Sequence, residues 1–282
     1  MKHFISRRNF LKAVGVTAAA SAMAAAVPQA SAGFLTGKDA AVTILYTNDV
    51  HTYIDHKSPK LTYAAIAAMK QGYVDEGKPV LLVDAGDHIQ GTAYGSMDDG
   101  ATIIELMNEA GYDIATLGNH EFDYGMARAK AIIKEADFPY VSCNWVDLRT
   151  GLRVLPAVKL FPAGGKWIAF VGITTPESFT KSTPAYFMNA KQTKYIYDIL
   201  GGDDGRKLYD AVQRAIDKAK TLGADIIIGL GHLGVDPSSS PWTSEDVIAN
   251  TTGFDAFIDG HSHTVMENKR VYDAAGKPVT LT

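Results

Sequence analysis

The sequence has almost no cysteine, no long run of one charge and no long apolar segment. Cys143 is the single cysteine among 282 residues, so no internal disulfide can form. We expect a buried, inert thiol there, because no histidine lies near Cys143 in the sequence. The absence of a basic run argues against a nucleic-acid polymer or an anionic membrane surface as the main partner.

The first 32 residues have the order of an export signal. Arg7-Arg8 followed by Phe10-Leu11-Lys12 is typical of twin-arginine signals, and Ala30-Ser31-Ala32 has the small residues of a cleavage site. The stretch between them, residues 13–27, is too short and too weakly apolar to span a bilayer. We therefore expect the twin-arginine export machinery to be a partner. Residues 33–282 would then act in the periplasm or outside the cell, without a membrane anchor.

The chain without residues 1–32 carries 23 basic and 31 acidic side chains, a net charge of −8. A local metal site can still attract an anionic substrate against this background. The length and apolar content suffice for one well-packed α/β domain.

Short β-branched runs alternate with longer amphipathic ones, which predicts the α/β class. The expected strands are 42–46, 80–83, 114–117, 140–142, 153–160, 167–173, 226–230 and 256–258. The expected helices are 60–73, 102–110, 126–136, 206–222 and 244–250. Residues 175–204 have no clear period, so we interpret them as a long surface loop that could cover a site. Residues 279–282 resemble the opening of a strand with no partner after it, as in a fragment or an early stop.

Polar clusters follow five of the expected strands. They are Asp49-Val50-His51, Gly86-Asp87, Gly118-Asn119-His120-Glu121, the single His232, and Gly260-His261-Ser262-His263. Because ligands bind at the carboxyl ends of strands in open α/β sheets, these clusters are expected to converge. Each motif alone is weak evidence, and it is the ordered set that predicts a site.

Carboxylate, imidazole and amide groups suit hard or borderline divalent ions such as Mn, Zn, Fe, Co or Mg. Thiolates are missing from the clusters, which disfavours a closed structural zinc site. Seven candidate ligands are too many for one open catalytic ion and about right for two ions that share a carboxylate. The sequence therefore predicts a dinuclear metal site.

The ordered motifs resemble those of the calcineurin-like metallophosphoesterase superfamily. The longer strings, residues 86–91 (Gly-Asp-His-Ile-Gln-Gly) and 118–125 (Gly-Asn-His-Glu-Phe-Asp-Tyr-Gly), are similar to its bacterial 5′-nucleotidase and 2′,3′-cyclic phosphodiesterase branch. The resemblance covers nearly all of residues 40–282. It implies a four-layer α/β/β/α sandwich of two mixed sheets, with the metals at the strand exits.

The resemblance also implies a role for each residue. One metal would be held by Asp49, His51, Asp87 and His263, and the other by Asp87, Asn119, His232 and His261. His120 would not be a ligand. It would face the phosphate, stabilise the charged transition state and help the leaving oxygen depart, with Asp123 orienting its ring.

Other residues near the motifs are weaker candidates. Asn48 could contact a ligand or serve a turn, and Glu121 is more often structural than catalytic. Gln90 and Thr92 could line the pocket, and His88 is most simply a solvated loop residue. The three tryptophans are expected in the core or at the rim, at positions Trp145, Trp167 and Trp242.

The leading functional hypothesis is an exported nucleotide phosphohydrolase of the 5′-nucleotidase type, which releases nucleoside and phosphate. A 2′,3′-cyclic phosphodiesterase or a UDP-sugar hydrolase would use the same site. The intact Asn119-His120-Glu121 string disfavours the thiosulfate-processing hydrolases of the superfamily. The family's C-terminal substrate-binding domain is expected to be absent and the domain at 33–282 truncated, so an inert metal-binding fragment is the remaining alternative.

Overall fold

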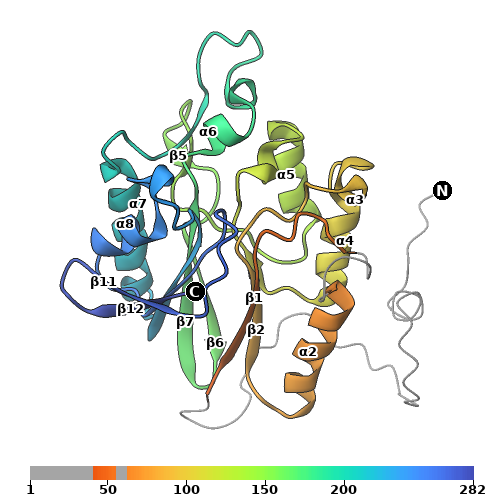
Figure 1. Cartoon of the computed structure of the whole chain (residues 1–282), viewed down its shortest axis with the longest axis vertical. Helices are drawn as coiled ribbons and strands as arrows, with labels where there is room; N and C mark the ends of the chain where they lie inside the picture. The colour runs from red at the N-terminus through yellow and green to blue at the C-terminus, as the bar shows by residue number, and fades with distance from the viewer. Residues whose placement is uncertain (1–40, 55–61) are drawn as a thin grey trace.

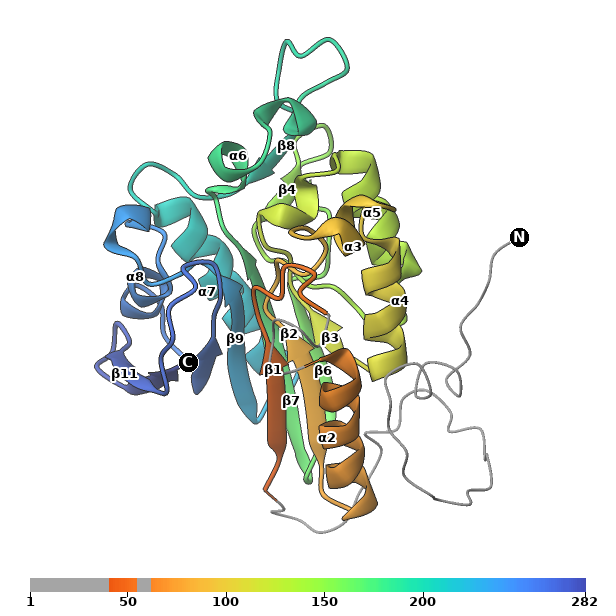
Figure 2. The ribbon, with the colours of Figure 1, turned by 45° about the vertical axis from the view of Figure 1, so that its right-hand side comes forward.

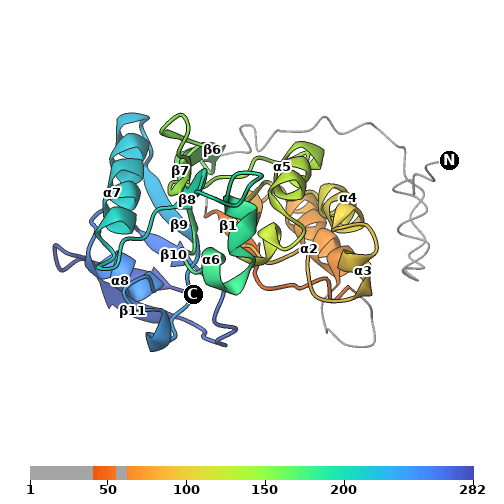
Figure 3. The same cartoon turned by 90° about the horizontal axis from the view of Figure 1, so that it is seen from above.

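The computed structural model describes residues 41–54 and 62–282. Two sheets face each other, and helices cover the outer face of each (Figures 1 and 3). Seen from above, helices α2 (Tyr63–Asp75) and α4 (Ala101–Ala110) lie on one side, and α7 (Arg206–Thr221) and α8 (Ser244–Ala249) lie on the other. The predicted α/β class and the α/β/β/α layer order are confirmed.

The smaller of these two sheets has strands in the order β1 (Thr43–Thr47), β2 (Val80–Asp84) and β3 (Ile114–Ala115), all parallel. Helix α2 packs along it, as Figure 2 shows. Helices α4 and α5 (Met126–Glu135) complete the layer, and the short α3 (Ala93–Ser96) precedes α4. The expected strand 140–142 is reduced to one bridge between Tyr140 and Ala115.

The larger sheet has six strands in the order β11-β12-β10-β9-β7-β6 and is mixed. Their bounds are β6 (Val158–Ala163), β7 (Lys166–Thr174), β9 (Ile226–His232), β10 (Ala256–Ile258), β11 (Lys269–Tyr272) and β12 (Pro278–Leu281). The predicted final strand is therefore confirmed as β12. Its partners precede it in the chain, however: β12 pairs with β10 in parallel and with β11 antiparallel.

Three buried clusters fill the three interfaces of the four layers. Strand β2 contributes to two of them because side chains alternate along a strand. Leu82 packs in the cluster under α2 and α4, whereas Leu81 and Val83 pack between the two sheets. The third cluster lies between α7 and the larger sheet and includes Cys143, which is buried as expected. Burial raises the pKa of the Cys143 thiol to about 12, so the thiol is unreactive at neutral pH.

Residues 175–204 are not a structureless loop, so that prediction was wrong. They contain the short α-helix α6 (Ser178–Lys181) and the 3₁₀ helix η2 (Pro184–Phe187), followed by β8 (Tyr197–Ile199). Strand β8 pairs with β4 (Trp145–Asp147), which also pairs with β5 (Leu152–Arg153) in a small third sheet. Fully buried Phe187 explains why the segment is ordered without a periodic pattern.

The predicted export signal at residues 1–32 lies outside the described residues, as does His56. Within 41–54 and 62–282, no helix is long and apolar enough to cross a membrane.

Candidate metal centre

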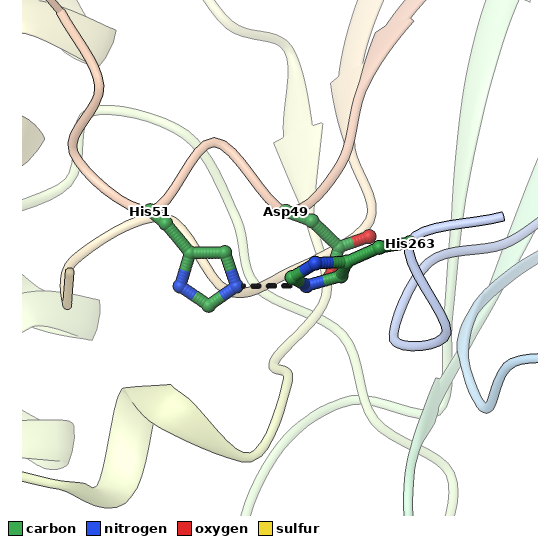
Figure 4. A group of neighbouring side chains, drawn as sticks. All are labelled: Asp49, His51 and His263. Atoms are coloured by element: carbon green, nitrogen blue, oxygen red, sulfur yellow. Dashed lines mark hydrogen bonds and ion pairs between the residues drawn. The ribbon is translucent and has the colours of Figure 1, made fainter. Parts of the chain in front are cut away.

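Side chains from five strand exits meet at one place. Asp49 and His51 follow β1, and His263 follows β10 (Figure 4). The Nε2 atoms of His51 and His263 lie 3.1 Å apart, and Asp49 Oδ1 lies 3.5 Å from His263 Nε2. We call Asp49, His51 and His263 the outer group. His263 is separated from the other two by more than 200 positions in the sequence and is brought to them by the sheet edge.

A second set lies deeper. Asp87 follows β2, Asn119 follows β3, His232 ends β9 and His261 follows β10. We call these four residues the inner group. Asp87, His232 and His261 offer ligand atoms within 4.8 Å of one another. Asp87 Oδ2 lies 2.9 Å from His232 Nε2 and 3.8 Å from His51 Nε2, so Asp87 stands between the two groups.

The arrangement of His232 fits a cation between the imidazole and the carboxylates. Its Nδ1 lies 2.7 Å from the carbonyl oxygen of Ala85, which can only accept, so Nδ1 carries a proton. In the neutral ring Nε2 bears the lone pair, 2.9 Å from Asp87 Oδ2, where either a proton or a metal ion can bind it. Burial alone would lower the pKa of His232, yet the negative charges of Asp87 and Asp49 raise it to about 10. A proton or a metal ion is therefore needed to neutralise the negative charges of Asp87 and Asp49 beside His232.

Asn119 gives an independent test of the fit. The residue is 2% exposed, and its Oδ1 is a buried acceptor without a hydrogen-bond partner among residues 41–54 and 62–282. Leaving a buried acceptor unsatisfied costs about 1–3 kcal/mol. The chain nevertheless holds Asn119 between Gly118 and His120, whose backbone N–H groups donate to the carboxylates of Glu121 and Asp87. An amide oxygen that lacks a protein donor is suited to a metal ion.

The backbone is strained at the candidate ligands. Eight described non-glycine residues have positive φ, and five of them belong to the two groups. The five are Asp49 (φ 49°), His51 (45°), Asp87 (59°), His261 (81°) and His263 (51°). Such conformations cost about 1–3 kcal/mol each and concentrate at functional sites, because stability alone does not select them.

Glycine is required at position 118, where the loop after β3 contacts the loop after β2. A Cβ added at Gly118 would lie 2.1 Å from Asp87 Oδ1 and 2.8 Å from His232 Cε1. The close approach of the β2 and β3 exits therefore depends on the missing side chain.

His120 lies beside Asp87, and its imidazole ring is partly exposed to solvent. Its backbone N–H donates to Asp87 Oδ1 at 2.8 Å, and its Nδ1 donates to Asp123 Oδ2 at 2.6 Å. Burial opposes protonation of His120, but Asp123 and Asp87 outweigh it and raise the pKa of the ring. The structure therefore pairs His120 with Asp123, the two residues predicted to act together.

Glu121 joins the loops rather than facing the site. Its carboxylate accepts the backbone N–H groups of Gly118 (2.6 Å), Asp87 (2.8 Å) and His88 (2.9 Å), which agrees with the predicted structural role. Asn48 donates to Asp49 Oδ2 at 2.7 Å and so contacts the outer group. Glu121 thus holds the backbone of Asp87, and Asn48 holds the carboxylate of Asp49.

His88 is not a solvated loop residue, and that interpretation was wrong. The side chain is fully buried; its Nδ1 donates to Asp84 Oδ1 at 2.8 Å, and its Nε2 lies 2.8 Å from the Tyr140 hydroxyl. Burial opposes the charged ring, but Glu121 and Asp84 outweigh it and raise the pKa of His88 to about 9. This network lies in the core beneath the β2 exit.

The remaining candidates have structural contacts. Thr92 caps α3, and the Gln90 carbonyl accepts from His51 Nδ1 at 3.1 Å. Trp145 is buried, Trp167 is 48% exposed, and Trp242 donates to the Gly202 carbonyl.

Sequence reasoning missed Glu177, which lies three residues after β7. Its Oε2 is 2.6 Å from His261 Nε2 and accepts from the Ser239 hydroxyl at 2.8 Å. The signal was present, because Glu177 follows a predicted strand as the other candidates do, but it was grouped with the aperiodic segment.

Comparison with known proteins agrees with this geometry. A model of the calcineurin-like phosphoesterase family matches residues 42–265. The human 5′-nucleotidase is 32% identical over 243 residues, which cover 80% of this chain and 38% of that protein. The chain thus spans about two fifths of the length of this relative.

Two solved structures share the fold. The calcineurin-like phosphoesterase YfkN from Bacillus subtilis has a TM-score of 0.67 and 26% identity, over 85% of this chain and 80% of that one. A 5′-nucleotidase precursor from Thermus thermophilus has a TM-score of 0.70 at 24% identity, over 86% and 48%. With its motifs, its layers and the match over most of its length, this chain belongs to the calcineurin-like phosphoesterase family.

Proposed function

We propose that the chain is a two-metal phosphoester hydrolase that acts on nucleotides, of the 5′-nucleotidase type. The observation that carries the proposal is the meeting of the outer and inner groups around Asp87, with a buried Asn119 oxygen that has no partner in the described part of the chain. Two divalent ions would supply positive charge for the phosphoryl oxygens and acidify a water molecule. Manganese or zinc suits the mixture of imidazole, carboxylate and amide ligands.

His120 would act on the phosphate from the protein side. Asp123 accepts a hydrogen bond from Nδ1–H, which leaves Nε2 to contact the substrate and give a proton to the departing oxygen. The backbone N–H of His120 donates to Asp87, and the ring is held by Asp123, so the ring keeps a fixed position relative to the proposed metal site. The hydrogen bond from Nδ1–H to the Asp123 carboxylate favours the protonated ring, which both stabilises negative charge and serves as the acid.

The substrate class rests on the relatives. The human relative is named a 5′-nucleotidase, and the trifunctional nucleotide phosphoesterase YfkN is 30% identical over 253 residues. Cyclic nucleotides and UDP-sugars present a phosphoester or phosphoanhydride to the same groups, so they are the alternative substrates.

The test is hydrolysis of an aryl phosphate, AMP, a 2′,3′-cyclic nucleotide and a UDP-sugar by the chain with Mn²⁺. Activity that prefers AMP and is lost in His120→Ala, by about 100- to 10,000-fold with metal content unchanged, supports the proposal. Metal bound without hydrolysis of any of the four would instead support a metal-binding fragment. A folded chain that binds no metal would contradict the proposal.

We further propose that the twin-arginine pathway exports the chain to the periplasm or beyond. The pair Arg7-Arg8 and the cleavage motif at 30–32 support this location. Replacing both arginines by lysine should leave the full-length chain in the cytoplasm, as detected by fractionation. Unchanged export of that variant would contradict the pathway.

A further inference from the structure

The contact between Glu177 and His261 joins an inner-group residue to a segment outside the recognised motifs. Glu177 follows β7 and immediately precedes α6, whereas His261 follows β10. The side chains are 14% and 9% exposed, and Glu177 Oε2 lies 2.6 Å from His261 Nε2. A contact this short between two mostly buried side chains is a charge-assisted hydrogen bond and not a solvent-exposed ion pair.

The chemistry of this contact determines which nitrogen of His261 can bind a metal. A carboxylate only accepts, so the proton lies on Nε2 and the lone pair of the neutral ring remains on Nδ1. A histidine that binds a metal needs one bare nitrogen, and its other nitrogen is commonly held by such a partner. Without Glu177, the proton could occupy either nitrogen, and the ring could also rotate.

Other contacts make Glu177 rigid enough for this role. The Ser239 hydroxyl donates to the same Oε2 at 2.8 Å, from the turn η3 (Pro237–Ser239). The His261 backbone N–H donates to both Asp49 oxygens at 3.0 Å, so the backbone of His261 is fixed separately from its ring. Glu177 therefore controls the ring alone.

We propose that Glu177 is a positioning residue that fixes the His261 tautomer, with the proton on Nε2 and Nδ1 free for the inner metal ion. The inference rests on the proposed two-metal function. It extends the centre to a sixth strand exit, that of β7, and makes the start of the 175–204 segment part of the metal site.

Two measurements test the role. Long-range ¹H–¹⁵N spectra of the metal-free chain report which nitrogen of His261 carries the proton. Equilibrium dialysis against Mn²⁺ reports the affinity of each ion. In Glu177→Gln we expect a smaller Nε2–H population and about 10- to 100-fold weaker binding of one ion, with the other unchanged.

Two further variants separate charge from local packing. Ser239→Ala loosens the turn but keeps the carboxylate, so the wild-type tautomer should persist. Glu105→Gln changes an exposed glutamate in α4 and should alter neither measurement. A proton on Nδ1 in the wild-type spectrum, or wild-type binding of both ions by Glu177→Gln, would overturn the inference. The spectrum needs no metal, so it tests Glu177 even if the proposed function fails.

Discussion

The outer and inner groups use similar side chains in different surroundings. In the inner group, Asp87, His232 and His261 are 2%, 0% and 9% exposed, and each has a second contact behind it. In the outer group, Asp49 and His51 are 6% and 13% exposed, whereas His263 is 61% exposed. The ion pair, hydrogen bond and ring contact of His263 are with Asp49 and His51. His263 is thus the most exposed of the candidate ligands. We expect the inner group to be formed before metal binds and the outer group to be completed by the metal. We therefore expect two ions with unequal affinities.

Asp87→Asn should have the largest effect, because Asp87 stands between the groups. Both ions should bind weakly, and hydrolysis should fall by about 1000-fold or more, as when a transition-state stabiliser is removed. Asp137→Asn, at an exposed position, is the matched control. Assays at saturating substrate and a metal analysis of the purified variant check this, and retention of both ions would contradict the shared role.

His232→Ala and His263→Ala compare the groups directly. His232→Ala removes a buried ligand and should lower activity by about 100- to 1000-fold at any Mn²⁺ concentration tested. His263→Ala should cost only about 10-fold, and raised Mn²⁺ should restore most of the loss, because an exposed ligand can be replaced by water. Equal effects of the two substitutions would refute the distinction between a preformed and a metal-completed group.

The loss of activity in Asn119→Ala should lie between the losses in His232→Ala and His263→Ala. The substitution removes an oxygen that has no hydrogen-bond partner among the described residues, so the folded chain without metal should lose little stability or gain some. Affinity for one ion should decrease by about 10- to 100-fold, and Asn119→Asp should retain it. Thermal melts with and without Mn²⁺ would detect both effects. A large loss of stability without metal would instead indicate a structural role.

Tyr140→Phe should have the smallest effect on the two groups, because it changes fold stability and not metal binding. It removes the hydroxyl that is hydrogen-bonded to buried His88 and should destabilise the fold by about 1–3 kcal/mol. Metal affinity should not change, since neither His88 nor Tyr140 belongs to the outer or the inner group. Urea unfolding checks the first expectation, with Tyr272→Phe at an exposed site as control. A change in metal affinity would show that the core network is coupled to the centre.

The placement of the candidate ligands could be predicted from the sequence because polar residues directly follow buried runs. Asp87 after β2 and His232 at the end of β9 need only the rule that parallel strands share their carboxyl edge. The α/β class follows from the same alternation of strands and helices. These signals are local, so one sequence suffices to detect them.

The contacts that failed prediction are those made across the fold. His88 resembled a solvated residue because its partners, Asp84 and Tyr140, come from different elements. Glu177 was missed because it meets His261 across 84 positions. The partner of β12 was overlooked because β11 is a charged, largely exposed edge strand that lacks a buried pattern. Burial and pairing of this kind are decided by tertiary packing rather than by local composition.

The most direct test of the account is a Mn²⁺ titration of the purified chain by equilibrium dialysis and elemental analysis. We predict two ions per folded chain in two separate steps, with the tighter step lost in His232→Ala and the weaker one shifted to higher Mn²⁺ concentration in His263→Ala. A single ion, or none, bound to a chain that is folded by circular dichroism would contradict the two-metal centre.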